Sequence, residues 1–229
     1  MTAVSIAISV ILPVYRNAET LPELHRRLTQ ALAPETFELI FVDDACPANS
    51  AAVLSQLAAS DPRVRVITHD RNHGQRFAVW HGLEAARGQI AITMDADLQD
   101  PPEAIPQLLA ALRANGAGAV YAARRGAYQS RGRMLTSRLY RTLLQSLTGI
   151  PADTGAYLAI TRPALDAILP LEMRSPYLPA LLVSTGLPFR GVPVQRDTRP
   201  AGDSAYSEMA RLRLAFHSLR AAWQLKRRR

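Results

Sequence analysis

The sequence predicts an α/β fold in which one mostly parallel sheet is flanked by helices. Short apolar runs rich in Val and Ile, which favour buried parallel strands, recur along the chain. Amphipathic segments of about 10–15 residues separate them, as in successive β-α-β units. Several runs are followed at once by aspartates, and folds of this class bind ligands beyond the carboxyl ends of their strands. We therefore expect one main domain with a site at that edge.

The composition favours a folded, soluble protein of the cytoplasm. Hydrophobic residues make up 48% of the 229 residues, and no apolar run approaches the roughly 18–20 residues that cross a bilayer. The N-terminus lacks the pattern of a signal peptide. The single cysteine, Cys46, cannot form an internal disulfide, which agrees with a reducing compartment.

The positive charge is concentrated near the C-terminus. The formal net charge is +8, and from Arg196 to Arg229 nine basic residues stand against three acidic ones. Such a segment suits an anionic membrane surface, an anionic substrate or a nucleic acid. We expect no nucleic-acid partner, because the segment has few interleaved aromatics and the chain has no recognised nucleic-acid module.

The first β-α-β unit begins with a strand at Ile6–Tyr15, which Pro13 is expected to end. A helix follows, with Thr20 or Asn17 as its cap. Its apolar stripe is Leu21, Leu24, Leu28 and Leu32. Phe37–Val42 is the second predicted strand, and it is followed by a pair of aspartates.

The next unit starts after a short apolar helix. Val64–Thr68 is the third predicted strand. Asn72 and Gly74 indicate a turn, and a helix is predicted from about Gln75 to Arg87, with Gly88 as its C-cap.

The fourth predicted strand, Ile90–Met94, leads directly into Asp95 and Asp97. Carboxylate oxygens are the ligands that Mg²⁺ and Mn²⁺ prefer, and Mg²⁺ is commonly held by one or two carboxylates together with substrate phosphates. The spacing alone is also compatible with a solvated turn. The five histidines show no metal-ligand spacing, and His73 is expected at the surface.

The second half of the chain is less regular. After a Pro pair, Ile105–Leu112 predicts a helix and Ala117–Ala123 a strand. Leucines at spacing four predict a helix that ends at Gly149, and Thr154–Ile160 predicts a loop entering a strand. A short helix beginning at Pro163 comes next. The last predicted strand contains Phe189, Val192 and Val194 and lies at an edge, since Pro188 and Pro193 limit its pairing.

A final helix is predicted from about Ser204 to Lys226. It combines an apolar seam with arginines on its other faces and a basic end. A helix of this kind can lie on an anionic membrane surface. The pattern is equally compatible with a helix that packs on its own domain.

Four motifs occur in an order that resembles the family 2 glycosyltransferases, which have the GT-A fold. They are Pro13-Val14-Tyr15, Asp43-Asp44, Asn72-x-Gly74-Gln75 and Met94–Glu103. The sequence is most similar to the branch that moves a sugar from a nucleotide-sugar to a polyprenyl phosphate, such as dolichol-phosphate mannosyltransferase and undecaprenyl-phosphate sugar transferases. Arg199–Leu212 resembles the RxxGxSKYS segment of that branch. The resemblance implies a catalytic domain over residues 1–200 and a membrane-proximal helix over 201–229.

The resemblance also implies roles for particular positions. Asp95 and Asp97 would hold the Mg²⁺ or Mn²⁺, with Asp97 as the more direct ligand. Asp153, Asp97 and Arg124 would act in catalysis, although Arg124 could equally be one of many exposed arginines and Asp153 a turn cap. Nucleotide-sugar contacts are implied for Pro13, Tyr15, Val42, Asp44, Asp95, Ala96, Asp97, Gln99 and Arg124. Acceptor or phosphate contacts are implied for Arg133, Ser137, Arg199, Ser204 and Tyr206.

The chain departs from the family pattern at several positions. The family's Asn-Glu after Tyr is Arg16-Asn17 here, and its Gly-Ser after the Asp pair is Ala45-Cys46. A lysine and an arginine that would help to bind an anionic acceptor or diphosphate are replaced by Ala205 and Ala159. These two changes leave the expected metal site intact and affect the expected binding of the acceptor.

The expected function is that of an inverting, metal-dependent transferase at the cytoplasmic face of the membrane. A nucleoside diphosphate leaves readily once a metal and an arginine neutralise its charge, and a lipid phosphate is already anionic. Two alternatives stay open: a family 2 transferase acting on a saccharide or protein acceptor in cell-envelope glycan synthesis, and a non-catalytic nucleotide-sugar-binding partner. A membrane protein or a second copy of the chain could bind it. Relatives often continue into transmembrane helices, so the chain is either a soluble member or a truncated one.

Overall fold

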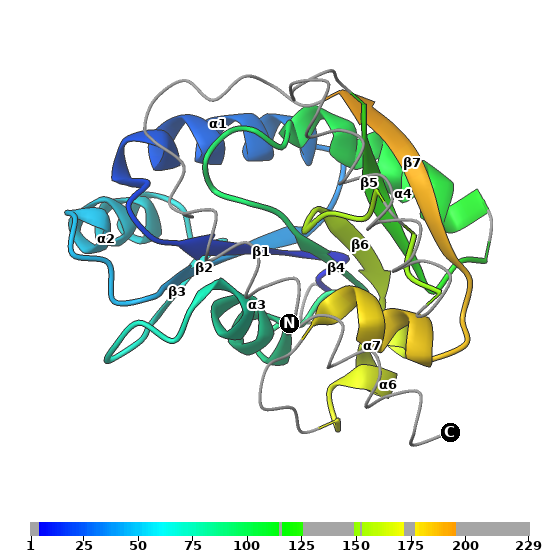
Figure 1. Ribbon diagram of the computed structural model, residues 1–229. Helices are drawn as coiled ribbons and strands as arrows, with labels where there is room; N and C mark the ends of the chain where they lie inside the picture. Colours follow the sequence, from blue (N-terminus) through cyan, green and yellow to red (C-terminus); the bar gives the residue numbers. More distant parts are fainter. Residues whose placement is uncertain (1–4, 115, 126–148, 152, 172–176, 196–229) are drawn as a thin grey trace, which may run out of the picture.

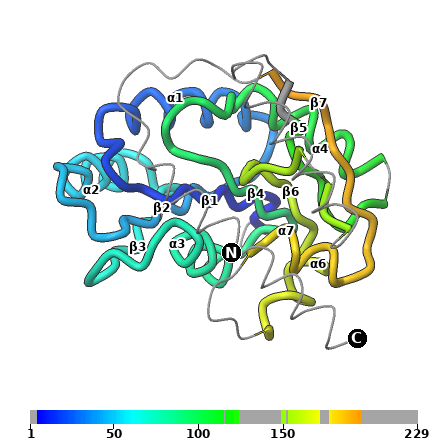
Figure 2. The backbone as a smooth tube through the Cα atoms, viewed as in Figure 1, coloured from blue at the N-terminus to red at the C-terminus, as the bar shows by residue number. Residues whose placement is uncertain are grey.

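The computed structural model describes residues 5–114, 116–125, 149–151, 153–171 and 177–195. Within these ranges seven strands form one sheet in the order β3-β2-β1-β4-β6-β5-β7, which Figures 1 and 2 show from the same side. The strands are β1 (Ile8–Val14), β2 (Phe37–Asp43), β3 (Val64–Thr68), β4 (Ile90–Thr93), β5 (Ala119–Arg125), β6 (Leu158–Thr161) and β7 (Phe189–Gln195). The helices are η1 (Ala18–Thr20), α1 (Leu21–Ala31), α2 (Ser50–Ser60), α3 (Gln75–Glu84), η2 (Pro102–Ala104), α4 (Ile105–Ala114), α6 (Arg162–Ile168) and α7 (Leu178–Ser184).

One strand runs against the others. β6 pairs antiparallel with both β4 and β5, whereas β1 pairs parallel with β2 and β4, β2 with β3, and β5 with β7. The carboxyl ends of β1, β2, β4 and β5 therefore meet at one edge of the sheet, together with the amino end of β6. The prediction of a mostly parallel sheet is confirmed, and so is the edge position of the last strand.

Helices cover both faces of the sheet. α1, α2 and α4 lie on one face, and α3, α6 and α7 lie on the other (Figure 1). Successive residues of β1 pack into the two hydrophobic cores in turn. Val10 and Leu12 lie in the core under α1, α2 and α4, and Ile11 lies in the core under α3, α6 and α7. Because both faces are buried, the strands are continuous apolar runs rather than alternating ones. The leucine stripe of α1 is also confirmed, since Leu24 and Leu28 have no exposed surface.

Pro13 does not end the first strand, contrary to the prediction. It lies within β1 and pairs in register with Val42 of β2. The carbonyl of Ile11 accepts a hydrogen bond from Met94 on the β4 side, and Pro13, two residues later, faces the same side. The β1–β4 register ends at Ile11 and Thr93, so the missing N–H of the proline breaks no ladder bond.

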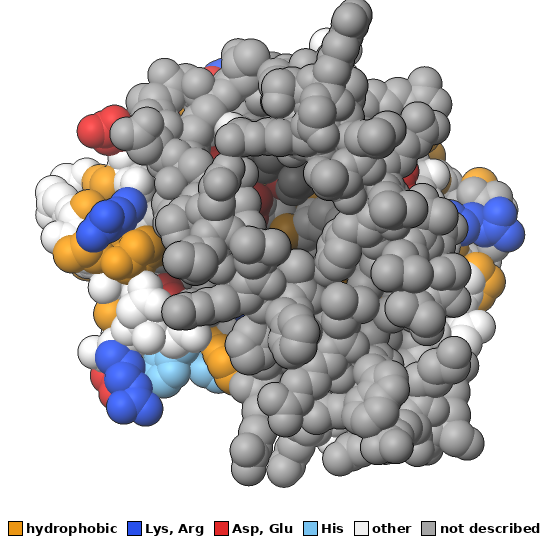
Figure 3. Space-filling view, viewed as in Figure 1, with side chains coloured by type: hydrophobic (Ala, Val, Ile, Leu, Met, Phe, Trp, Pro, Cys, Tyr) orange, Lys and Arg blue, Asp and Glu red, His pale blue; other side chains and the backbone are white. Residues whose placement is uncertain are grey.

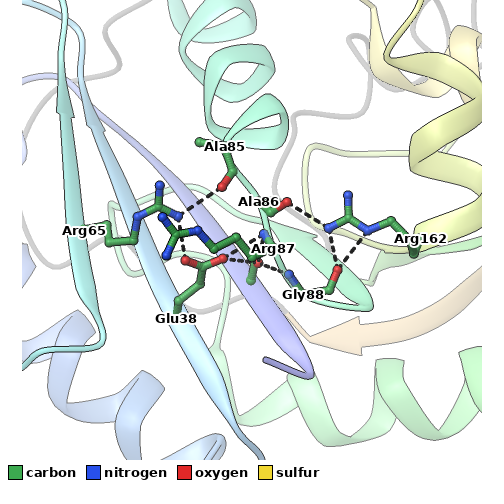
Figure 4. A network of polar contacts seen from close by, with 8 residues as sticks. Glu38, Arg65, Ala85, Ala86, Arg87, Gly88 and Arg162 are labelled. Atoms are coloured by element: carbon green, nitrogen blue, oxygen red, sulfur yellow. Dashed lines mark hydrogen bonds and ion pairs between the residues drawn. The ribbon is translucent and has the colours of Figure 1, made fainter. Parts of the chain in front are cut away.

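The helix α3 ends at Glu84, earlier than the predicted end near Arg87. Side chains from neighbouring elements bind the backbone just beyond it, as Figure 4 shows. Arg65 donates to the Ala85 carbonyl, and Arg162 donates to the carbonyls of Ala86 and Gly88. Gly88 is therefore not a helix cap. It allows a close approach instead, because a Cβ on it would lie 2.5 Å from the backbone nitrogen of Ser9.

Glu38 is the acidic centre of this network (Figure 4). One carboxylate oxygen accepts bonds from the Ser9 hydroxyl at 2.7 Å and the Arg87 N–H at 2.9 Å, and the other accepts from Arg65 at 2.7 Å. Burial by itself raises the pKa of Glu38, but these three donors together outweigh it and hold the pKa below its usual value. The ionised form of the Glu38 carboxylate therefore stabilises the folded state.

Replacing Glu38 by Gln is expected to lower the free energy of unfolding at neutral pH by about 2 kcal/mol, because the three hydrogen bonds lose their ionised acceptor. The stabilisation by Glu38 is complete above the pKa of an unfolded glutamate and is lost as pH falls through the lower folded value. The stability difference between wild type and Glu38→Gln should thus shrink on acidification below about pH 4.5. Urea unfolding across pH 3–8 measures this, with the exposed Glu19→Gln as control. A difference that stays constant at acid pH contradicts the assignment.

The helix α7 was not predicted. Its residues Leu178–Leu182 are all buried, so it has no polar face from which a helical period could be recognised. Two predicted helices, the one ending at Gly149 and the basic one after residue 200, lie outside the described residues, and the domain boundary at 200 stays a prediction. Across the described part of the chain, no helix has both the length and the apolar character needed to span a bilayer.

Candidate functional site

The carboxyl edge of the sheet carries most of the residues that the sequence singled out. Tyr15 follows β1, Asp44 follows β2, and Asp95 and Asp97 follow β4. Since β1 lies between β2 and β4, these side chains come from three adjacent strand ends. Arg124 is the penultimate residue of β5, whose carboxyl end points the same way.

The turn after β4 places two carboxylates in different surroundings. Asp97 accepts a hydrogen bond from the Gln99 N–H at 3.1 Å, and Leu98 between them has a left-handed backbone with φ of 63°. Asp95 accepts a bond from the side-chain amide of Gln75, the first residue of α3, at 2.5 Å. Both aspartates are half-buried. The turn is thus fixed by its own backbone and by a neighbouring helix.

Ala96, between the two aspartates, points into the hydrophobic core and is 1% exposed. Its carbonyl oxygen lies 2.6 Å from the Thr20 hydroxyl. Thr20 therefore ties the turn to the start of α1 rather than capping that helix through its side chain. This arrangement leaves only the backbone of Ala96 for a contact with a nucleotide-sugar.

Asp44 is buried and has three hydrogen-bond donors. Its carboxylate accepts from the His69 ring, the His73 N–H and the Gly74 N–H, each at 2.8 Å. All three donors belong to the segment that joins β3 to α3. A carboxylate has about four acceptor positions, so Asp44 mainly organises this loop and retains room for one further donor.

The histidines form a cluster that the sequence reasoning missed. Nδ1 of His69 lies 2.8 Å from an oxygen of the Asp44 carboxylate, and Nε2 of the same ring lies 2.8 Å from Nδ1 of His81. The rings of His69 and His73 lie edge to face at 5.1 Å. Pale-blue histidine side chains are visible together beside α3 in Figure 3. His73 is only partly exposed, and the signal for the cluster was that His69 directly follows β3.

Two other residues expected at the nucleotide lie deeper than predicted. Val42 has no exposed surface and packs under α3, where a Cβ on Gly82 would lie 3.2 Å from it. Pro13 is buried within β1. Tyr15, in contrast, is 38% exposed, and the guanidinium of Arg16 lies 5.4 Å from its ring centre. Of these three, Tyr15 alone presents its side chain at the surface.

Non-glycine residues with positive φ follow three strands at this edge. Arg16 follows β1 with φ of 61°, Ala45 follows β2 with φ of 51°, and Leu98 lies after β4. A left-handed backbone costs an L-residue about 1–2 kcal/mol. This conformation places backbone strain next to the candidate site.

Replacing Ala45 by Gly is expected to raise the free energy of unfolding by about 0.5–1 kcal/mol, because relief of the strained φ exceeds the added chain entropy of glycine. Ala52→Gly on the exposed face of α2 is the matched control, and it should lower that free energy by about 1 kcal/mol. Urea unfolding compares the two. Destabilisation by both variants would show that Ala45 is not strained.

Asp153 lies in the loop before β6 and is exposed. Its carboxylate accepts a hydrogen bond from the Tyr121 hydroxyl at 3.0 Å. Burial, and then the bond to Asp153, raise the pKa of Tyr121 well above its usual value. The tyrosine therefore remains a protonated donor that orients this carboxylate.

Ala159 was expected in a loop-to-strand segment where the family has an arginine that binds an anion. It is instead in the middle of β6, paired with Ile92 and Val120, and has no exposed surface. An arginine there would enter the core, so this alanine removes no anion-binding group. The side chain of Arg124 and the implied acceptor residues lie outside the described part. These acceptor residues are Arg133, Ser137, Arg199, Ser204 and Tyr206.

The donor atoms present fit a hard divalent cation. Asp95 and Asp97 supply carboxylate oxygens at a strand end, where the bonds from Gln75 and Gln99 orient them. Within the described residues no group of three or more His, Cys, Asp and Glu side chains is arranged to hold a metal ion. Two carboxylates suit an ion that takes its other ligands from phosphates and water.

Comparison with known proteins places this arrangement in a family. Residues 9–169 match glycosyl transferase family 2. The undecaprenyl-phosphate 4-deoxy-4-formamido-L-arabinose transferase of Pseudomonas fluorescens (strain SBW25) is 40% identical over 220 residues, which cover 93% of this chain and 63% of that protein. The chain thus spans less than two thirds of that relative.

Solved structures have the same fold. A mannosyltransferase from Pyrobaculum calidifontis, in complex with GDP-Man and Mn²⁺, matches with a TM-score of 0.65 and 18% identity over 88% of this chain and 59% of its own. Glucosyl-3-phosphoglycerate synthase from Mycobacterium tuberculosis, with Mn²⁺, UDP-glucose and phosphoglyceric acid, matches with a TM-score of 0.68 and 20% identity over 95% and 79% of the two chains. Because the family match covers more than half of the sequence and the sheet agrees with these structures, the chain belongs to the family 2 glycosyltransferases with the GT-A fold.

Proposed function

We propose that the chain transfers a sugar from a nucleotide-diphosphate sugar to a polyprenyl phosphate, in a metal-dependent reaction that inverts the anomeric carbon. The observation that carries the donor half is the pair Asp95 and Asp97 at the end of β4, each oriented by a glutamine. The acceptor half rests on the relative at 40% identity, whose name states undecaprenyl phosphate.

In this proposal Asp95 and Asp97 would hold Mg²⁺ or Mn²⁺, and the bound ion would supply positive charge for the leaving diphosphate. Arg124 at the end of β5 binds the same diphosphate from the other side of β6. Tyr15 and the Asp44 loop flank the nucleoside. The leaving diphosphate is stabilised by positive charge rather than by a proton, so the chain needs to move no proton at the donor.

The acceptor phosphate is already anionic at neutral pH and can attack the anomeric carbon directly. A strong general base is therefore unnecessary, and direct displacement inverts the anomeric configuration. Asp153, held by the Tyr121 hydroxyl, orients the reacting groups. The basic segment after residue 200 binds the anionic membrane surface at its cytoplasmic face, which brings the site to the lipid.

A thermal-shift screen tests the donor half. UDP, GDP, CDP and ADP are each added with and without Mn²⁺, and one of them should raise the melting temperature only when Mn²⁺ is present. A lack of any metal-dependent shift contradicts the proposal. Donor binding without any turnover, with metal and lipid vesicles supplied, would instead support a non-catalytic binding partner, and a water-soluble product would support a saccharide or protein acceptor.

A further inference from the structure

We infer that Gln75 is a positioning residue for the metal site, and that the loop His69–Gly74 fixes the position of Gln75. The inference deepens the proposed function and rests on it, since it takes Asp95 as a metal-binding carboxylate. The amide nitrogen of Gln75 lies 2.5 Å from one oxygen of Asp95. A neutral amide that donates to a carboxylate fixes the orientation of that carboxylate.

The position of Gln75 is set by its backbone rather than by its side chain alone. Gln75 is the first residue of α3 and follows Gly74, which has a left-handed φ of 89°. The Gly74 carbonyl accepts bonds from Phe77 and Ala78 in the first turn of the helix. The direction in which Gln75 leaves the loop is therefore fixed at the start of α3.

Asp44 binds the loop that immediately precedes Gln75. Its carboxylate binds the backbone N–H groups of His73 and Gly74, which immediately precede Gln75. It also binds the His69 ring, and His69 in turn is hydrogen-bonded to His81 two turns along α3. The loop is thus bound both to the end of β2 and to the helix that carries Gln75.

The helix itself is anchored on the sheet. A Cβ on Gly82 would lie 2.5 Å from Ile11 of β1 and 3.2 Å from Val42 of β2, so α3 approaches both strands closely. This contact leaves α3 little freedom to shift along the sheet. A continuous set of contacts consequently runs from Asp44, beside the nucleoside, through the loop to Gln75 and Asp95.

The test measures metal binding apart from catalysis. Free Mn²⁺ is followed by its electron paramagnetic resonance signal while Mn²⁺ is titrated into the full chain with saturating UDP, and separately with GDP. Replacing Gln75 by Met, which has a similar length and no donor, should weaken Mn²⁺ binding about 10-fold. In transfer assays the Mn²⁺ concentration for half-maximal rate should rise by a similar factor, while the rate at saturating Mn²⁺ stays within about twofold.

A matched glutamine is the control. Gln56 is exposed on α2, and Gln56→Met should leave Mn²⁺ affinity and melting temperature unchanged. Gln75→Ala provides a second readout if the Met variant folds poorly. An unchanged Mn²⁺ affinity in both Gln75 variants, together with its loss in Asp97→Asn, overturns the role of Gln75 and leaves the proposed function standing. Failure of the wild-type chain to bind Mn²⁺ with either diphosphate overturns both.

Discussion

Replacement of Asp97 by Asn is expected to lower glycosyl transfer by about 1000-fold and to abolish the Mn²⁺-dependent thermal shift. Asn keeps the oxygen that accepts the Gln99 N–H, so the turn after β4 should persist. The variant loses the negative charge that, in the proposed function, binds the metal. A loss of about 4 kcal/mol of transition-state stabilisation corresponds to this factor in rate.

The matched control is Asp166→Asn. Asp166 is exposed on α6 and interacts only weakly with Arg162, at 3.5 Å. α6 begins at the carboxyl end of β6, which is the opposite edge of the sheet from Asp97. Transfer and metal response should both match the wild type in this variant. Full transfer by Asp97→Asn, measured over a range of Mn²⁺ concentrations, would remove Asp97 from the metal site.

Asp44→Asn is expected to destabilise the chain by about 2–4 kcal/mol. The buried carboxylate accepts three hydrogen bonds, and an amide in its place turns a second donor toward the Gly74 N–H. Charge-assisted bonds contribute about 1.5–3 kcal/mol each, and an unpaired buried donor adds its own cost. Urea unfolding measures the loss. Nucleotide affinity should fall with it, because the loop that is proposed to flank the nucleoside is released.

The neighbouring residue supplies the comparison. Asp43 is as buried as Asp44, at 2% exposure each, but accepts one backbone bond, from Cys46 at 2.9 Å. Asn at position 43 can keep that bond, so Asp43→Asn should cost about 1 kcal/mol or less. If both variants lose the same free energy of unfolding, burial of the charge, rather than the number of hydrogen-bond donors, determines the loss.

Much of the fold could be predicted because its strands are apolar runs with acids at their ends. Val64–Thr68 was predicted with its observed bounds, and the position of Asp95 and Asp97 after β4 followed from the sequence. The reversal of β6 could not be predicted in this way. A four-residue buried strand has the same apolar pattern in either direction, and only its partners β4 and β5 fix its orientation.

The contacts within the site were harder to predict than its position. Asp44 was expected to face the nucleotide, but its partners come from a loop about 25–30 residues later in the chain. The family resemblance implied contacts between the nucleotide-sugar and both Val42 and Ala96, whereas the side chains of these residues face the two cores. The position of a residue in a sequence motif does not determine on which face of the sheet its side chain lies. The expected acceptor residues lie outside the described part of the chain.

The most direct measurement follows the label from donor to acceptor. The chain is incubated with Mn²⁺, vesicles that contain undecaprenyl phosphate, and each of a set of nucleotide-sugars labelled in the sugar. We expect one donor to transfer its label to the organic phase, and we expect EDTA or the Asp97→Asn substitution to prevent the transfer. Label that remains in the aqueous phase for every donor tested would contradict transfer to a polyprenyl phosphate.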